Sequence, residues 1–469
     1  MKRLLIVLPI AAIALSGCAT MAPKYARPAA PVPSVWPTGA AYGASEPKPP
    51  GMAAADIAWV DYFTNDALRK VIALALSNNR DLRIATLSIE RARALYRIRQ
   101  ADLFPSVNAS GGAAAQRVPE TLSGVGKPIT THQYDVGVGV SGYELDLFGR
   151  VQSLKNQALE SYLATEQARR SVQISLVSEV AGQWLALASD RERLRLAGET
   201  LGTQEKSYEL TKRRFEGGVS SELDLRQAQT SVDAARIDIA RYTSVIAQDR
   251  NALELLAGGP VPEELLPAQL DAASAMQDLA PGIPSEVLQR RPDILEAEGQ
   301  LKGANANIGA ARAAFFPRIT LTTSIGLGSD QLGDLFKGGA GMWSFAPRIT
   351  LPIFEGGANL ANLKVAETDR DIFVAQYEKA IQGAFREVAD ALAQRGTLGE
   401  QLSATQSLVD AAAATRKLSD ARYEKGVDSY LSVLDAQRTL YAAQQNLIAV
   451  RLAHLANRVT LYKALGGGA

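Results

Sequence analysis

Residues Tyr423 to Gln437 read Y-E-K-G-V-D-S-Y-L-S-V-L-D-A-Q, and residues Phe215 to Gln229 read F-E-G-G-V-S-S-E-L-D-L-R-Q-A-Q. The leading aromatic residue, the Glu, the Gly, the Val and the closing Ala-Gln recur at a constant offset of 208 residues (423 − 215). Self-similarity at a fixed offset is typical of a duplicated structural unit. The sequence therefore predicts one unit that occurs twice in the chain.

Each of the two stretches has the pattern of a turn between two helices. Helical periodicity ends at Gly217-Gly218 and at Gly426, and Ser221 and Ser429 precede the next helix. Glycine favours the left-handed conformation that ends a helix, and serine is a preferred N-cap residue. Behind the second turn, apolar or aromatic residues recur every seven positions: Leu434, Tyr441, Ile448, Leu455 and Tyr462. This period predicts coiled-coil packing, which also suits a bundle with a purely structural role.

A second duplicated pattern precedes each turn. Helical periodicity runs from about 65 to 103 and ends at Phe104-Pro105, and it returns from about 285 to 315 and ends at Phe316-Pro317. The offset is 212 residues (316 − 104). We therefore expect one helix in each half of the chain at these positions.

After each Phe-Pro the apolar pattern changes to alternation. We expect four strands, at about 106–116, 133–146, 318–327 and 343–354. Apolar residues on one face and small or polar residues on the other are typical of transmembrane β-barrel strands, although an ordinary half-buried antiparallel sheet has the same pattern.

Four strands cannot close a barrel by themselves. In hydrocarbon, the backbone N–H and C=O groups of an open sheet edge have no partners. If these strands span a membrane, the protein must therefore be an oligomer. Two copies would give eight strands with a filled interior, and three would give twelve strands with room for a lumen.

The strand pairs are followed by the longest helical tracts of the chain, at about 150–215 and 357–423. Apolar residues in these tracts follow a three-four spacing, which predicts amphipathic helices. At 1.5 Å per residue, each tract would reach about 100 Å.

The chain begins with the features of a secretory signal peptide. An apolar run from Leu4 to Leu15 follows a positively charged start and is too short to span a membrane. The run ends in L-S-G-C, which resembles the bacterial lipobox, and Cys18 is the only cysteine. The resemblance implies removal of residues 1–17 and acylation of Cys18, with palmitate among the lipids. Ala19 after this cysteine suggests sorting to the outer membrane.

Charge and motif content exclude other classes of protein. Lys and Arg number 50 and Asp and Glu 49, so the formal net charge of +1 gives no reason to expect a nucleic acid partner. His132 and His454 are far apart, and the sequence has no nucleophile-base motif, phosphate loop or metal-spaced cluster. We expect a protein that is not an enzyme and has no metal or cofactor besides the covalent lipid on Cys18.

Several motifs occur together with the lipobox and the duplicated units: L-D-L-F-G-R at Leu145 to Arg150, R-R-P-D-I at Arg290 to Ile294, the second turn, and the ending L-Y-K-A-L-G-G-G. Together they are similar to the outer-membrane efflux lipoproteins of the TolC/OprM (NodT) family, over essentially the whole mature chain. The resemblance implies a mainly α-helical fold with a transmembrane β-barrel. In this fold a homotrimer builds a twelve-stranded barrel, four strands per chain, which is continued by a long periplasmic α-helical coiled-coil barrel.

The resemblance also implies a function. Such proteins are exit ducts of tripartite efflux systems, held in the cell outer membrane by a lipid anchor and by the barrel. They passively conduct drugs or other small solutes from an inner-membrane RND-type transporter and a periplasmic adaptor. The alternatives are the outer-membrane channel of a type I protein secretion system and a non-conducting, periplasm-spanning structural coiled coil.

We accordingly divide the chain into five parts: a signal peptide (1–17), a lipid-anchored extended arm (18–60), a first repeat (61–257), a proline-rich equatorial linker (258–284) and a second repeat (285–469). Each repeat comprises a helix, two strands, a long helix, a tip and a helix. Trp36 and Trp59 are the expected packing anchors of the arm.

We call Phe215–Gln229 the first tip and Tyr423–Gln437 the second tip. By resemblance, the constriction of the duct lies at Leu431 and Asp435, one helical turn apart, and Tyr423 ties neighbouring hairpins together. Three copies would form an apolar ring that excludes water and a carboxylate ring that favours cations. The alternatives are an i,i+3 pair between Asp435 and Arg438, and simple packing of Tyr423 at the end of its helix.

The same resemblance places the adaptor contact at Gly217, Gly218, Gly426 and Val427, although turn formation alone explains the glycines.

Two acidic residues need separate interpretation. Asp224 is a possible first-repeat counterpart of the gate carboxylate, but Ser221-x-x-Asp224 fits a capping arrangement better. The TolC protein has an Arg at the position of Asp428, so a lock of that kind is not expected here.

Overall fold

The computed structural model describes residues 20–42, 54–270, 276–277, 279 and 285–468. The predicted signal peptide and Cys18 therefore lie outside the described residues. The described chain forms two compact units. Unit 1 comes from Met1–Ala29, Ile89–Thr165 and Ala297–Tyr377, and unit 2 from Ala30–Ser88, Glu166–Glu296 and Glu378–Ala469. Each unit thus draws on both repeats.

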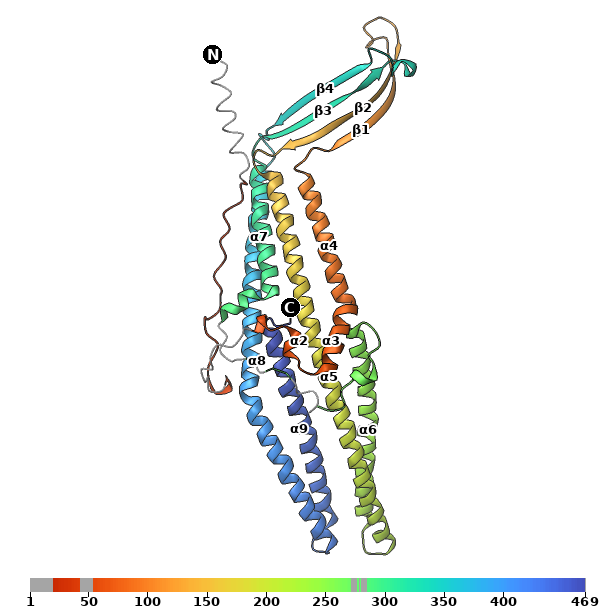
Figure 1. The fold of residues 1–469 in the computed structure, drawn as a ribbon, viewed down its shortest axis with the longest axis vertical. Coiled ribbons are helices and arrows are strands. Elements are labelled where there is room, and N and C mark those ends of the chain that lie inside the picture. The colour runs from red at the N-terminus through yellow and green to blue at the C-terminus, as the bar shows by residue number, and fades with distance from the viewer. Residues whose placement is uncertain (1–19, 43–53, 271–275, 278, 280–284, 469) are drawn as a thin grey trace. The chain divides into compact units, whose positions relative to one another are not determined.

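Unit 1 contains one antiparallel sheet with the strand order β1-β2-β3-β4 (Figure 1). The strands are β1 Val107–Val118, β2 Ile129–Leu145, β3 Arg318–Ser329 and β4 Gly341–Thr350. The four predicted strands are confirmed, with shifted ends. β2 begins earlier because Ile129 pairs with Val118. β4 ends at Thr350, which pairs with Arg318, the first residue of β3.

Pairing register gives the sheet an apolar face and a polar face. Val138 of β2 lies opposite Ala109 of β1 and Ile325 of β3, and Ile325 lies opposite Trp343 of β4. Ile325 and Trp343 are 71% and 77% exposed, as expected of side chains that face lipid. The sequence neighbours of these residues on each strand point to the polar face, and one row of that face is Asn108, Gly139, Ser324 and Ser344.

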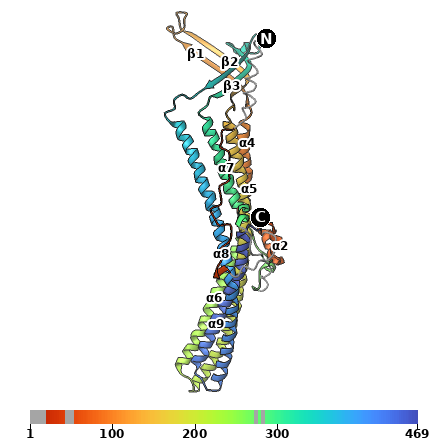
Figure 2. The ribbon, with the colours of Figure 1, turned by 90° about the vertical axis from the view of Figure 1, so that its left-hand side faces the viewer.

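Two hairpins of long helices complete the duplicated pattern: α5 Arg150–Glu216 with α6 Glu222–Ala257, and α8 Ala358–Glu424 with α9 Tyr430–Ala464. α5 and α8 have 67 residues each, and their starts and ends both differ by 208 (358 − 150 and 424 − 216). This confirms the predicted long tracts and the duplication. Figure 2 shows the turns of both hairpins at the same end of unit 2.

Short elements of the described residues include α2 Trp59–Tyr62 and the 3₁₀ helices Ala40–Tyr42, Ala54–Asp56, Glu263–Leu265, Ser285–Arg290 and Leu332–Asp334. Among the residues that the structure describes, no helix combines the length and apolarity that a membrane span requires.

The prediction of one helix before the first Phe-Pro is wrong. Asn79 has an extended backbone and separates α3 (Asp66–Asn78) from α4 (Arg80–Ala101). Its side-chain oxygen accepts a hydrogen bond from the Leu82 N–H at 2.9 Å, and its amide donates to the Leu256 carbonyl at 3.0 Å. A polar side chain that caps the next helix thus ends the first one.

The second repeat breaks its helix at the equivalent position, so that prediction is wrong as well. A 3₁₀ helix, Ser285–Arg290, precedes α7 (Pro292–Ala313). Proline suits the first position of a helix but disfavours the helical conformation in the residue before it. That residue is Arg291, which lies 212 positions after Asn79 (291 − 79).

An aromatic cluster formed with the chain ending lies in the core of unit 2. The rings of Tyr62 and Tyr462 stack at 3.9 Å, and Phe63 packs edge-on against both. The Tyr62 hydroxyl donates to the Arg458 carbonyl at 2.8 Å, and the Tyr462 hydroxyl donates to the Ile57 carbonyl at 2.5 Å. Buried tyrosines need such partners for their hydroxyls, so the ending and the segment around α2 are fixed together.

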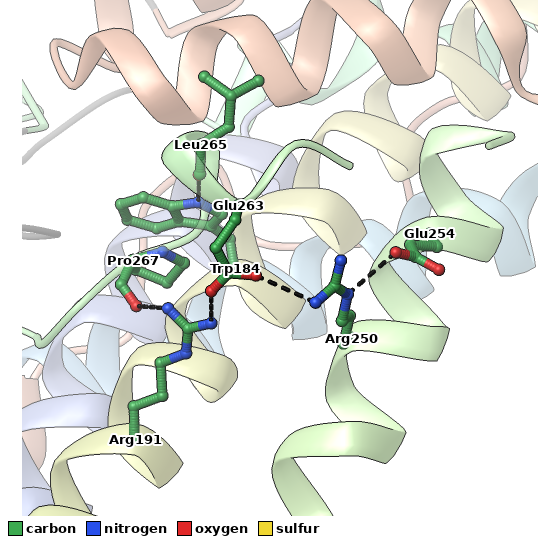
Figure 3. A network of polar contacts seen from close by, with 7 residues as sticks. All are labelled: Trp184, Arg191, Arg250, Glu254, Glu263, Leu265 and Pro267. Carbon is green, nitrogen blue, oxygen red and sulfur yellow. Dashed lines mark hydrogen bonds and ion pairs between the residues drawn. The ribbon is translucent and has the colours of Figure 1, made fainter. Parts of the chain in front are cut away.

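Figure 3 shows how the beginning of the predicted linker is held in unit 2. Trp184 of α5 is 1% exposed and donates its indole N–H to the Leu265 carbonyl at 2.9 Å. Arg191 of α5 and Arg250 of α6 both pair with Glu263, at 2.5 and 3.0 Å. This segment is therefore fixed to both helices of the first hairpin by hydrogen bonds and ion pairs.

The arm is anchored within each unit by a different interaction. In unit 2, Trp36 stacks on Phe385 with ring centroids 4.9 Å apart, which confirms this predicted anchor. Trp59 is half-buried at the start of α2, and its role as an anchor stays a prediction. In unit 1, Arg27 donates two hydrogen bonds to Glu298, at 3.0 and 2.7 Å. The Glu298 side chain is 3% exposed and the Arg27 side chain 46%, so the carboxylate of this ion pair is shielded from water and the guanidinium is only partly covered.

The R-R-P-D motif contains one buried and one exposed arginine. Arg291 is 9% exposed and donates to the Ala464 carbonyl at 2.6 Å, at the end of α9. It also pairs with Asp293 and Glu387, at 2.8 and 2.9 Å. Arg291 thus joins the start of α7 to α8 and to the end of α9 inside unit 2, whereas Arg290 is exposed.

We predict that Arg291→Met lowers the temperature at which the trimer dissociates in detergent, as read from heat-modifiable mobility on gels. The substitution removes charge-assisted hydrogen bonds and leaves the Ala464 carbonyl without this donor, at a cost of about 2 kcal/mol. Arg290→Met is the matched control and should leave the temperature unchanged. Equal effects of the two substitutions would contradict this role of Arg291.

Candidate gate and docking tips

Both tips turn with the same backbone geometry. The Val219 N–H donates to the carbonyl of Arg214 at 2.8 Å, and Gly218 has a φ of +74°. In the second tip, the Val427 N–H makes the equivalent bond at 2.9 Å, and Gly426 has a φ of +72°. This is the Schellman ending of a helix, which needs a left-handed residue. The predicted glycine turns are therefore confirmed.

The first tip is closed by a capping box. The Ser221 hydroxyl accepts a hydrogen bond from the Asp224 N–H, and the Asp224 carboxylate accepts one from the Ser221 N–H, both at 3.1 Å. Burial acts to raise the pKa of Asp224, but hydrogen bonds from Ser221 and Ser220 outweigh it and lower this pKa below its usual value. The capping interpretation of Asp224 is confirmed.

The second tip replaces this cap with an ion pair. Ser429 makes no side-chain cap, and Asp428 instead accepts two hydrogen bonds from Arg422, at 2.6 and 2.9 Å. The hydrogen bonds from Arg422 lower the pKa of Asp428. The charge at position 428 is thus balanced within its own hairpin, by an arginine in the last turn of α8.

Leu431 and Asp435 lie together on the exposed side of α9. Leu431 is 57% exposed, and Asp435 is exposed one helical turn later. Leu434 lies on the buried side of the helix, in a cluster with Ala228 of α6. The ion pairs of the described residues include none between Asp435 and Arg438, so the alternative pairing is not observed.

Tyr423 links the two hairpins of one protomer. Its ring lies 4.6 Å from Cζ of Arg214 on α5, in a cation-π contact, and 5.5 Å from the ring of Tyr430 on α9. Tyr430 is buried, which raises its pKa to about 12. Sequence reasoning missed Arg214, although its equivalence to Arg422 (422 − 208) was a usable signal.

Each tip exposes the same apolar pair. The pairs are Val219 with Leu223 and Val427 with Leu431, all between 57% and 69% exposed. Sequence analysis did not single out Leu223, which the repeat offset would have revealed. The carboxylate is not duplicated, because the first-tip equivalent of Asp435 is Gln227 (435 − 208).

A polar contact joins α6 to α9 farther from the tips. The Tyr441 hydroxyl donates to Asp238 at 2.8 Å, and the Gln445 amide donates to Tyr441 at 2.9 Å. The Tyr242 hydroxyl in turn donates to Gln445 at 3.1 Å. Together with the Tyr423 contact, this network fixes the second hairpin against the first.

The histidines do not gather into a site. His132 lies in β2 and His454 in α9. Within the described ranges, no group of three or more His, Cys, Asp or Glu residues could hold a metal ion.

The sheet and the hairpins together define a class of protein. The outer edges of β1 and β4 have no strand partner in the described part of the chain, and the apolar face is exposed, so several copies must close one barrel in a membrane. Long helical hairpins attached to such a barrel are the architecture of an outer-membrane duct. The chain belongs to the outer membrane efflux protein family, whose model matches residues 71–259 and again residues 283–467.

Family membership establishes the assembly and the activity. The protein is a homotrimer in which twelve strands, four per chain, form a β-barrel, and the long helices form a periplasmic α-helical barrel. It is the outer-membrane exit channel of an efflux system and not an enzyme.

Similar proteins cover nearly the whole chain. It is 50% identical over 469 residues, 100% of this chain and 96% of the relative, to the probable efflux pump outer membrane protein TtgC of Pseudomonas putida. It is 44% identical over 458 residues, 97% of this chain and 94% of the relative, to the outer membrane protein OprJ of Pseudomonas aeruginosa. The open state of the MtrE outer membrane channel of Neisseria gonorrhoeae matches with a TM-score of 0.85 at 38% identity, over 96% of this chain and 98% of that chain.

The adjacent glycines of the first tip provide a matched test of the turn. We predict that Gly218→Ala increases amide hydrogen exchange across the first tip by about five- to thirtyfold, because a left-handed alanine costs about 1–2 kcal/mol. Gly217→Ala should leave exchange unchanged, since Gly217 lacks a positive φ and Lys425 occupies the equivalent position (425 − 217 = 208). Faster exchange in Gly217→Ala than in Gly218→Ala would contradict the assignment.

Proposed function

We propose that this exit channel serves an inner-membrane RND-type transporter through a periplasmic adaptor, and that it passively conducts drugs, organic solvents and similar small solutes. The names of its relatives support this substrate class. Proteins 50% identical to the chain are named as antibiotic and toluene efflux pump components, and one 49% identical as a solvent efflux pump component. These names favour efflux over type I protein secretion.

We propose that the second tip is the gate of the duct. Leu431 and Asp435 share one exposed face of α9, so three copies around an axis would present an apolar ring and a carboxylate ring. The apolar ring would exclude water, and the carboxylate ring would favour cations in transit. The single observation that carries the proposal is this exposed i, i+4 pair on α9.

Tyr423 fits the gate proposal as a tie that opening must loosen. Its cation-π contact with Arg214 holds the second hairpin to the first near the tip, and the Tyr441–Asp238 bond does so farther away. A cation-π contact is worth about 0.5–2 kcal/mol, which a bound adaptor can offset. The first hairpin would then act as the fixed frame and the second as the moving part.

We propose that the adaptor docks on the turns of both tips, at the exposed Val219 and Val427. Val427 and its equivalent Val219 follow the glycines that shape each turn, Gly426 and Gly218, and Gly217 precedes the first of these. In a trimer, six similar turns would present six apolar contacts to a partner with matching hairpin ends. Because both turns offer a similar apolar contact with no fixed pattern of charges, the same kind of partner surface could bind either tip.

We propose that acylated Cys18 adds a lipid anchor to the barrel in the outer membrane. The L-S-G-C pattern supports this, and the covalent lipid is the only prosthetic group that we expect. The described arm begins two residues later at Thr20, whose hydroxyl lies 2.6 Å from the Ser153 hydroxyl of α5 in unit 1. Two membrane attachments would act together, since one acyl chain binds only reversibly.

The gate proposal predicts that Leu431→Ala/Asp435→Ala raises single-channel conductance in planar bilayers strongly above that of the wild type. Removing both rings widens the constriction, and water is then excluded from it less readily. The repeat-equivalent pair Leu223→Ala/Gln227→Ala is the matched control and should conduct like the wild type. A wide-open wild type, or equal opening by the control pair, would refute the assignment to the second tip.

The anchor proposal predicts that radiolabelled palmitate is incorporated into the wild type and not into Cys18→Ser. Because Cys18 is the only cysteine, no other thiol can take the label. Both proteins should fractionate with the outer membrane, since the barrel remains. Label in Cys18→Ser, or none in the wild type, would exclude the proposed acylation.

A further inference from the structure

The polar face of the sheet carries few charges. Most of its positions are Gly, Ala, Ser, Thr, Asn or Gln. By register, its charged residues on the four strands are Asp135, Glu144, Arg318 and Arg348. Because the apolar face must meet lipid, the polar face lines the lumen of the barrel. These few charges therefore set the electrostatic character of the barrel wall.

Asp135 of β2 is flanked by glycines on both neighbouring strands. Its neighbours across the ladders are Gly112 of β1 and Gly328 of β3. A Cβ atom at Gly112 would lie 3.0 Å from Oδ1 of Asp135, so the carboxylate occupies the space that this glycine leaves. No ion pair among the described residues includes Asp135. Its negative charge thus faces the lumen without a neutralising partner.

The charged strand residues near the helical ends of the strands comprise a paired carboxylate and two arginines. Glu144 is paired with both Arg150 and Arg318, at 2.7 and 2.6 Å. Arg348 of β4 lies opposite Thr320 of β3, in the row that also contains Glu144. No ion pair in the described part of the chain includes Arg348, and the residue is exposed. Arg348 is therefore the strand residue at this level whose charge has no ion-pair partner in the described part of the chain.

We propose that Asp135 and Arg348 form two rings of opposite charge in the trimer, and that these rings set the charge preference of the barrel for ions and solutes. The rows of Asp135 and Arg348 meet β3 at Gly328 and Thr320, eight residues apart (328 − 320). This separation is about 26 Å along the strand. It exceeds the Debye length of about 10 Å at 0.1 M salt, so the two rings act independently of each other.

The inference rests on the exit-channel function and concerns a different region from the proposed gate. The Asp435 ring belongs to unit 2, whereas Asp135 and Arg348 belong to unit 1. The test therefore uses the Leu431→Ala/Asp435→Ala background, in which the tip carboxylate cannot mask the barrel. The conductance then tests whether the protein is an open channel. The reversal potential in a KCl gradient tests whether the two charged rings set its ion selectivity.

At about 0.1 M KCl, Asp135→Asn should shift the reversal potential toward the chloride equilibrium potential. Arg348→Gln should shift it in the opposite direction, toward the potassium equilibrium potential. The conservative variants Asp135→Glu and Arg348→Lys keep the charges and should match the background. At about 1 M KCl, where the Debye length falls to about 3 Å, both shifts should disappear.

Unchanged reversal potentials in channels that conduct normally would overturn the two-ring proposal while leaving the exit channel intact. Shifts in the same direction, or shifts that persist at high salt, would also overturn it. Trimer mobility on gels for every variant ensures that a loss of folding is not read as a change in selectivity. Absence of conductance in all intact trimers would contradict the channel function itself, and the inference with it.

Discussion

Backbone hydrogen bonding at the outer edges of β1 and β4 governs the assembly of this protein. Each chain supplies four strands, and the N–H and C=O groups along the two outer edges cannot remain unpaired in hydrocarbon. Pairing β4 of one protomer with β1 of the next satisfies them and closes the barrel. Closure around an axis then brings three sets of hairpins together, so that single residues of one chain become rings. The proposed gate and both proposed charged rings depend on this step.

Duplication gives the two hairpins one backbone plan, and local substitutions give them different roles. α5 and α8 have equal lengths and end in the same turn with a left-handed glycine. Arg214 lies over the ring of Tyr423, which belongs to the other hairpin. Its equivalent Arg422 instead pairs with Asp428 of its own hairpin. Asp435 has the neutral equivalent Gln227. The first tip thus carries the capping box, and the second carries Tyr423 and the carboxylate of Asp435.

The features that sequence predicted well were those set by local rules. Glycines fixed the turns at Gly218 and Gly426, alternation located four strands, and Ser221-x-x-Asp224 proved to be a cap. The helix breaks were missed because the apolar periodicity continues through them. At Asn79 the break depends on a side chain that caps the next helix, which periodicity does not reveal. Arg214 was missed because its partner is distant in sequence. The choice between two and three copies followed from family resemblance, since edge pairing alone allows both.

The most direct test of this account is native mass spectrometry of the intact protein released from detergent micelles. Edge pairing and family architecture together predict one dominant species with three chains, which persists when the tips are altered, because the barrel holds it together. A dominant monomer under conditions that preserve the sheet would contradict edge pairing, and a dominant dimer would contradict the closure by three copies that the proposed gate ring and the proposed barrel rings require.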